Sequence, residues 1–220
     1  MLNIKILGER NSGTIFLEKL FQKNLLNVNI MDGSHKSNTG WKHGFLYKKI
    51  VKKYNRNTLF VFIIRDIEPW LKSMYKNPYH IQTRKNIREF TTKPLLPKEF
   101  RKLHPINWDM RERMDLVSLR YAKIMSYLGA TRIMNNYLFL NLSEVQKNYE
   151  RVLDFISTQF NIKKREKVIP ILKHTKIRSN VQNRNYNLVL PNIKKRNNNL
   201  ELFISKLKEK YLYKTNLKKI

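Results

Sequence analysis

A glycine-bracketed loop follows the first apolar run of the chain. The run Ile4–Leu7 has the character of a buried strand, and Gly8-Glu-Arg-Asn-Ser-Gly-Thr14 follows it directly. An apolar stripe at helical spacing then predicts a helix over 13–25. Glycines let a backbone approach a ligand closely, and the start of a helix presents unpaired N–H groups with partial positive charge. A strand, loop and helix in this order therefore indicate a phosphate-binding loop.

The loop differs at one position from the loops that hydrolyse ATP or GTP. In those, the second glycine precedes a lysine that reaches the terminal phosphates and a Ser or Thr that holds magnesium. Here Gly13 is followed by Thr14, while Arg10 supplies the cation and Ser12 a further hydroxyl. The loop can therefore hold an anion without magnesium. The alternative is an ordinary turn, because small polar residues often connect a strand to a helix.

Size and composition favour one globular domain over residues 1–220. Of the 220 residues 41% are hydrophobic, which suffices for a well-buried core. No apolar run approaches the roughly 20 residues of a membrane span, and no signal peptide is evident, so we expect a soluble, cytoplasmic protein. The chain has no cysteine, which excludes disulfides, thiolate catalysis and cysteine-ligated zinc. The five histidines lack metal-ligand spacing, so no metal is expected.

The charge of the chain is strongly positive. Lys and Arg outnumber Asp and Glu by 45 to 16, a net charge of +29 that would attract nucleic acid, anionic glycans or phosphorylated ligands. The heavy use of Lys, Asn and Ile throughout is explained equally well by the codon bias of an AT-rich genome. A basic nucleic-acid-binding protein with a nucleotide-binding-like fold therefore stays open as an alternative function. A nucleotide kinase is less favoured because the loop lysine is absent.

Apolar runs and helical patterns alternate along the chain. Continuous apolar runs at 58–64 and 137–142, with a weaker one at 28–31, are typical of strands buried on both faces of a parallel sheet. The helical patterns lie at 45–55, 67–76, 110–129 and 144–160. Ser143 is the expected N-cap of the last of these helices. The alternation predicts an α/β fold, a three-layer sandwich with a central, mostly parallel sheet.

Two segments stand apart from this alternation. Residues 77–109 contain four prolines and few periodic positions, which predicts a long loop of the kind that covers an active site. Residues 163–220 form a basic carboxyl-terminal segment. Within it, the apolar spacing over 200–207 predicts a short amphipathic terminal helix.

A second group of donors follows the most apolar strand. That strand ends in Arg65-Asp66, and Ser73 follows eight residues after Arg65. Ligands of open α/β sheets bind beyond the carboxyl ends of the strands, so Arg65 should lie near Gly8 if the two strands are neighbours. A second phosphate of one nucleotide could then bridge both groups. The alternative for Arg65 and Ser73 is a solvent-exposed helix start.

Together, the two motifs resemble those of sulfotransferases that use 3'-phosphoadenosine 5'-phosphosulfate (PAPS). Gly8–Thr14 resembles that family's 5'-phosphosulfate loop, and Arg65–Tyr75 resembles its 3'-phosphate motif, in which a strand-end arginine and a serine eight positions on hold the 3'-phosphate. The resemblance covers about residues 4–160, including Leu140–Val145 where the family has a strand before a helix. Some branches carry lysine in the loop where this chain has Arg10-Asn11.

The resemblance implies a P-loop-like fold, PAPS as cofactor, 3',5'-ADP as product and no required metal. It implies in-line transfer of a sulfonate to a hydroxyl or amine of an acceptor, such as a carbohydrate or another small molecule. The basic composition is weak support for an anionic glycan, and nucleic acid is a secondary candidate partner. The residues implied to bind the cofactor are Gly8, Arg10, Asn11, Ser12, Gly13, Thr14, Arg65 and Ser73.

Sulfonate transfer depends on alignment, on stabilising charge and on a base for the acceptor proton. Arg10 and the loop amides are suited to stabilising the negative charge of the transferring group. Gly40-Trp41-Lys42-His43-Gly44 follows the second predicted strand, where the family often places its base, so we expect His43 as base and Lys42 as sulfonate ligand. His35 and Glu18 are alternative bases. The plainer interpretation of His43 is a surface turn residue.

The remaining candidates have plain roles available to them. Glu18 could simply complement the helix dipole or pair with a nearby lysine. His80 follows the arginine and serine motif and is a candidate for lining the acceptor cleft. Tyr79 and Trp70 could stack on adenine or substrate, although packing is the commoner fate of aromatic residues.

Overall fold

A five-stranded sheet forms the centre of the protein, with strand order β2-β1-β3-β4-β5. The structure is a computed structural model of the chain. The residues that it describes are 1–34, 36–78, 81–82, 84, 86–96, 99, 114–171 and 198–216. The strands are β1 (Leu2–Leu7), β2 (Val28–Ile30), β3 (Thr58–Ile64), β4 (Tyr137–Asn141) and β5 (Leu212–Lys214).

The first four strands are parallel, as expected. Strand β1 pairs with β2 and β3, and β3 pairs with β4, with Leu7 opposite Phe62 and Phe62 opposite Phe139. All seven residues of β3 are buried. A continuous apolar strand of this kind is stable only with both faces covered, and that is its position at the centre of the sheet.

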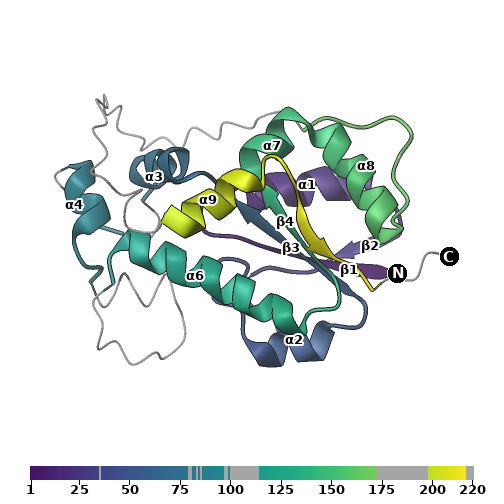
Figure 1. The fold of residues 1–220 in the computed structure, drawn as a ribbon, viewed down its shortest axis with the longest axis horizontal. Helices are drawn as coiled ribbons and strands as arrows, with labels where there is room; N and C mark the ends of the chain where they lie inside the picture. The colour runs from purple at the N-terminus through teal and green to yellow at the C-terminus, as the bar shows by residue number, and fades with distance from the viewer. Residues whose placement is uncertain are drawn as a thin grey trace.

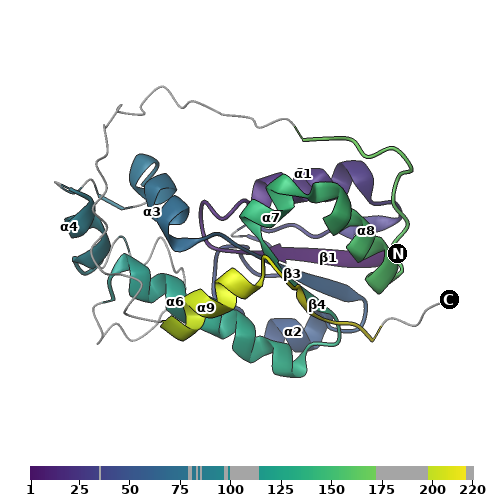
Figure 2. The ribbon, with the colours of Figure 1, turned by 45° about the horizontal axis from the view of Figure 1, so that its top comes forward.

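Helices cover both faces of the sheet (Figures 1 and 2). One face packs against α1 (Thr14–Asn24), α7 (Leu142–Lys147) and α8 (Tyr149–Phe160). The other is covered by α2 (Lys48–Tyr54), α6 (Leu116–Ala130) and α9 (Asn198–Lys206), and α3 (Ile67–Lys76) and α4 (Ile87–Thr92) join the same apolar cluster. The expectation of an α/β three-layer sandwich is therefore confirmed.

The expected helix over 144–160 is wrong in two details. The N-cap is Asn141, whose Oδ1 accepts hydrogen bonds from the main-chain N–H of Ser143 at 2.9 Å and from its hydroxyl at 2.6 Å. Helix α7 thus begins two residues earlier than expected. It ends at Asn148, whose φ of −130° and ψ of 45° separate α7 from α8. Short polar side chains compete with the helix for backbone groups, and Asn141 does so here, whereas the Asn148 side chain donates to the Glu144 carboxylate at 3.0 Å.

Two further elements differ from the expectation. Strand β5 was not predicted, and it pairs with β4 in the antiparallel direction. Within the expected loop at 77–109 lies helix α4, whose Phe90 is buried in the same core as Leu95. The expected terminal helix corresponds to α9, whose Leu200 and Ile204 are buried. No helix in the described ranges is long and apolar enough to span a membrane.

Candidate functional site

The loop from Gly8 to Thr14 connects β1 to α1, as expected. Gly13 caps the helix with a left-handed φ of 97° and, as a glycine, provides no side-chain hydrogen bond to the first turn of α1. The first turn also contains no acidic residue. The helix dipole therefore presents uncompensated positive charge, a state that a bound anion would stabilise by about 0.3–1 kcal/mol.

The second motif lies against this loop. The Nη1 of Arg65, just beyond β3, donates to the main-chain oxygen of Asn11 at 3.1 Å. The side-chain amide of Asn11 in turn donates to the main-chain oxygen of Ser73 at 3.3 Å and lies 3.1 Å from the sulfur of Met74. The expectation that Arg65 lies near the loop is thus met, because β1 and β3 are neighbouring parallel strands.

A cavity of about 780 Å³ opens beside the loop. This volume falls in the range of small-molecule sites. Of the residues expected to form the site, those that line the cavity are Arg10, Asn11, Gly13, Thr14, Lys42, His43 and Arg65. Gly8, Ser12 and Ser73 are not among the lining residues. The Ser12 side chain is fully buried, and its Oγ packs against Gly8.

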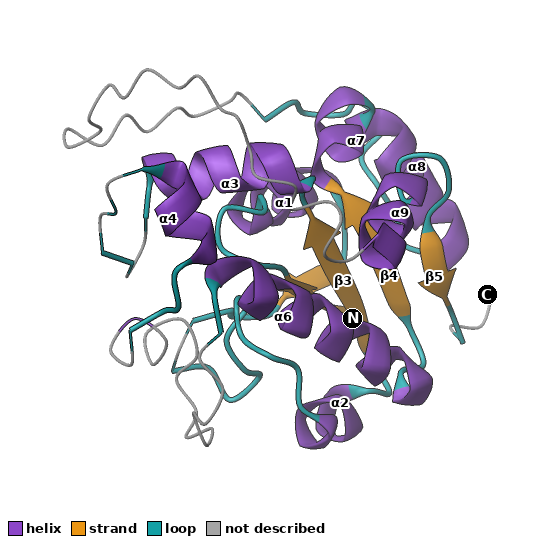
Figure 3. Cartoon of the chain, turned by 60° about the vertical axis from the view of Figure 1, so that its left-hand side comes forward, coloured by secondary structure: helices purple, strands orange, loops and turns teal. Residues whose placement is uncertain are grey.

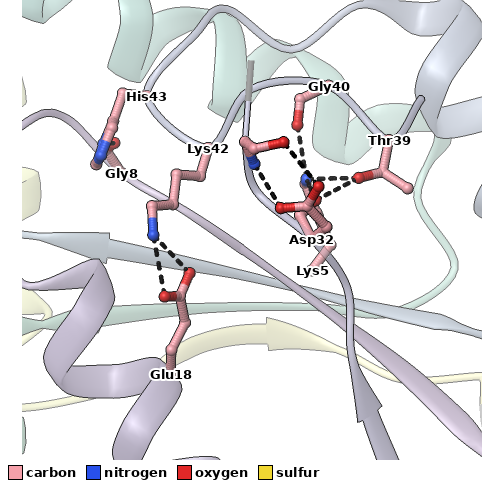
Figure 4. Close-up of polar contacts among 9 residues, drawn as sticks. Lys5, Gly8, Glu18, Asp32, Thr39, Gly40, Lys42 and His43 are labelled. Atoms are coloured by element: carbon pink, nitrogen blue, oxygen red, sulfur yellow. Dashed lines mark hydrogen bonds and ion pairs between the residues drawn. The ribbon is translucent and has the colours of Figure 1, made fainter. Parts of the chain in front are cut away.

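Lys42 and Glu18 form an ion pair at the wall of the cavity (Figure 4). The Lys42 Nζ donates to both carboxylate oxygens of Glu18, at 2.9 and 3.0 Å. Glu18 thus has the plain role foreseen for it, pairing with a nearby lysine. Lys42 faces the cavity with its charge already matched, so a sulfonate at this position would share the ammonium group with Glu18.

His43 is buried, so its interpretation as a surface turn residue is wrong. Only 9% of its surface is exposed, and its Nδ1 lies 2.8 Å from the main-chain oxygen of Gly8. A carbonyl oxygen only accepts, so Nδ1 carries the proton and Nε2 is left with a lone pair. The ring also meets Trp41 edge-on at 5.4 Å. This fixed tautomer suits a group that accepts a proton at Nε2.

Burial holds His43 neutral. Its pKa is lowered from the ordinary value of 6.5 to about 3, mainly by burial and further by the positive charges of Arg10, Lys42 and Lys123, while the hydrogen bond to Gly8 opposes the shift. An anion bound next to Arg10 would offset part of this repulsion. The imidazole would then become a stronger base when the cavity is occupied.

The low pKa of His43 predicts a loss of stability in acid. Below pH 6.5 the unfolded chain binds a proton at this histidine and the folded chain does not, so unfolding becomes easier by up to about 1.4 kcal/mol per pH unit down to about pH 3. The His43→Asn variant keeps an N–H donor for Gly8 but does not titrate. Denaturant unfolding of both proteins from pH 7 to pH 4 should show the steeper decline in the unsubstituted chain.

The unsubstituted protein has to be compared with His43→Asn because Glu9 also titrates in this pH range. Burial raises the pKa of its carboxyl, against the charges of Arg120 and Lys123, so Glu9 titrates with the opposite sign and stabilises the folded state as pH falls. Both proteins contain Glu9, so its contribution cancels when their unfolding free energies are subtracted at each pH. Parallel pH profiles would contradict the assignment of a depressed pKa to His43.

A buried lysine holds the segment that carries Lys42 and His43. Lys5, in the middle of β1, donates to the main-chain oxygens of Asp32 and Gly40 at 2.8 and 2.6 Å and to the hydroxyl of Thr39 at 2.7 Å (Figure 4). All three hydrogens of the ammonium group are thereby used. Burial lowers the pKa of Lys5 to about 8, against the attraction of the Asp32 charge.

Three functional candidates were missed from the sequence. Trp41 has two cations near its ring, with the guanidinium of Arg10 5.0 Å and the Nζ of Lys123 5.6 Å from its ring centre. Glu9, a residue of the loop itself, is 98% buried, and neither carboxylate oxygen has a hydrogen-bond partner. Burial lowers the pKa of Lys123 to about 8, while Glu9 opposes that shift. Only the position of Trp41 next to Lys42 was a signal for this cluster.

The other sequence candidates divide into two groups. Trp70 is buried in the core beneath the loop, so packing is its role, and its Nε1 donates to the main-chain oxygen of Arg10 at 2.8 Å. His35, Tyr79 and His80 lie outside the described residues. Among the residues that are described, no group of three or more His, Asp or Glu side chains could hold a metal ion.

No family model, curated protein or solved structure matches the chain. A function therefore has to be argued from the motifs and from the geometry of the cavity.

Proposed function

We propose that this protein is a PAPS-dependent sulfotransferase, which moves a sulfonate to a hydroxyl or amine of a small acceptor such as a carbohydrate. One observation carries the proposal. The loop between β1 and α1 and the strand-end Arg65 line a single cavity, although 50 or more residues separate them in the chain. The loop and the arginine of the second motif thus face the same space, whereas Ser73, the other expected ligand of the 3'-phosphate, is not among the residues that line it.

The residues of the cavity fit this cofactor. Its 5'-phosphosulfate would lie on the first turn of α1, where Thr14 and Arg10 line the wall and no carboxylate occupies the helix start. Its 3'-phosphate would lie at Arg65, whose guanidinium has donors beyond the one used on Asn11. When bound, the cofactor supplies the activated sulfonate.

Different side chains of the protein would then have different roles in sulfonate transfer. His43 would take the acceptor proton at Nε2 as the new oxygen–sulfur bond forms. Arg10 and the N–H groups of the first turn would stabilise negative charge on the phosphate oxygen as its bond to sulfur breaks. Lys42 would hold the sulfonate in line while Glu18 fixes the lysine.

Ligand-induced stabilisation tests the class of protein. We expect 3',5'-ADP to raise the Tm without magnesium, and to do so more than ATP with magnesium or a short oligonucleotide, because only binding to the folded state stabilises it. Replacing Arg10 or Arg65 by Ala should weaken 3',5'-ADP binding by about 10- to 100-fold, since each loses a charged hydrogen bond.

Arg132→Ala is the matched control for these variants. It removes the same charge from an exposed position in the short turn Thr131–Ile133, which is not part of the cavity. Its affinity should stay within about twofold of the unsubstituted protein. If the oligonucleotide alone stabilises the protein, and more weakly at high salt, the nucleic-acid-binding alternative holds instead.

A further inference from the structure

Arg120 of α6 is a buried guanidinium that connects separate elements behind the cavity. Its side chain has no exposed surface. The Nη2 donates to the main-chain oxygen of Arg65 at 2.5 Å, and the Nη1 donates to Glu201 Oε1 of α9 at 3.2 Å. Helices α6 and α9 lie on the same side of the sheet (Figure 3). One side chain therefore joins the end of β3, helix α6 and helix α9.

Trp70 extends this connection to the loop. The guanidinium of Arg120 lies 5.0 Å from the ring centre of Trp70, a cation–π distance. The indole N–H of the same tryptophan donates to the main-chain oxygen of Arg10 at 2.8 Å. The stacked pair thus binds the main-chain oxygens of Arg65 and Arg10, the two arginines that line the cavity.

Glu201 supplies the carboxylate that the buried guanidinium needs. A charge in the interior is costly unless it is paired and hydrogen-bonded. The Oε1 of Glu201 accepts from Arg120 and also from the hydroxyl of Tyr121 at 3.0 Å. Burial and the nearby Glu201 carboxylate raise the pKa of Tyr121, so its hydroxyl stays a donor. The carboxylate is thereby fixed against two consecutive residues of α6.

We propose that Arg120 is a positioning residue that sets the separation of Arg10 and Arg65, and that Glu201 holds Arg120 in place, so that α9 is part of the nucleotide site. The nature of the ligand depends on the proposed function. The connection through Arg120 does not depend on the proposed function, because it consists of contacts within the chain.

The test compares a ligand with two anionic groups and a ligand with one. If Arg120 sets the spacing of the two arginines, Arg120→Lys and Glu201→Gln should lose the preference for 3',5'-ADP over 5'-AMP, measured as the ratio of the two Kd values by calorimetry. We expect this ratio to fall by roughly fivefold or more in both variants. A ratio unchanged from the original protein would overturn the proposal.

Lys208→Met is the matched control. Lys208 follows α9 and pairs with Asp66 at 2.9 Å, so this variant removes another ion pair between the same segment and the end of β3 without touching Arg120. It should leave the Kd ratio unchanged even where the Tm falls. An equal fall of the ratio in Lys208→Met would show general loosening of the segment and would count against Arg120 as the positioning residue.

A second measurement needs no ligand. Hydrogen exchange of the Trp70 indole N–H, followed by NMR, should be about tenfold faster in Arg120→Lys and Glu201→Gln, and unchanged in Lys208→Met. Unaltered exchange in all three variants would reject the connection between Arg120 and the Arg10 carbonyl. If exchange changes as expected while the original protein shows no preference for 3',5'-ADP, the connection stands and the proposed function fails.

Discussion

The Gly8→Ala variant is expected to lose about 2–3 kcal/mol of unfolding free energy and its nucleotide affinity together. A Cβ at this position would lie 2.4 Å from the Ser12 Oγ and 2.5 Å from the main-chain oxygen of Ile63. The second neighbour is backbone of the central strand β3, so it cannot rotate away. Gly8 also donates from its N–H to the Lys42 oxygen at 2.9 Å and accepts from His43. A shift of Gly8 therefore moves the loop and the expected base at once.

Gly129→Ala is the control for this substitution. Gly129 lies near the end of α6, and a Cβ there would meet nothing within 4 Å. The same change of residue should therefore stabilise the protein, by up to about 1 kcal/mol, because alanine favours the helix. Chemical denaturation of both variants measures the contrast. If Gly8→Ala unfolds within about 0.5 kcal/mol of the original protein, the tight packing of the loop against β3 is wrong.

The His43→Asn variant is expected to lose turnover by about 10²- to 10⁴-fold while it binds 3',5'-ADP almost as before. Asparagine can still donate to the Gly8 oxygen, so the loop keeps its hydrogen bond. What disappears is the Nε2 lone pair of a residue that lines the cavity. The measurement is the rate of sulfonate transfer from PAPS to an accepted substrate, alongside the Kd of 3',5'-ADP.

Glu18→Gln and His35→Asn complete this experiment, because both residues are alternative bases. Glu18→Gln keeps the shape of the side chain but weakens the ion pair with Lys42. It should reduce turnover less than His43→Asn does. Retained turnover in His43→Asn, with a large loss in one of the other two variants, would assign proton transfer to that residue instead.

Patterns of hydrophobic residues predicted most of the parallel part of the sheet because β1, β3 and β4 are largely buried, whereas β2, which gave the weaker signal, has no buried residue. Strand β3 is apolar from Leu59 to Ile64 and could hardly be mistaken for another element. Strand β5 gave no comparable signal. Its three residues are all exposed, and its pairing with β4 depends on neighbouring structure rather than on its own composition.

The site was predictable only where its residues are close together in the chain. The loop from Gly8 to Thr14 and the strand-end Arg65 could be recognised locally, whereas the expected partner Ser73 is not among the residues that line the cavity. The burial of charged residues could not be predicted from the local sequence. Arg120 and Lys123 stand in a helix whose charged positions would normally face solvent, yet both are buried, because their partners come from other elements. The Glu18–Lys42 pair likewise joins segments 24 residues apart.

The contact between Arg120 and Glu201 also bears on the order in which the protein forms during synthesis. The two residues are 81 positions apart, and the loop, β3 and α6 all precede Glu201 in the chain. A nascent chain that has emerged only as far as β4 contains both cavity arginines but not Glu201, the carboxylate that is hydrogen-bonded to Arg120. Domains form progressively during synthesis, so the parallel core can assemble before Glu201 reaches Arg120, and the contact that we propose to position Arg10 and Arg65 forms last.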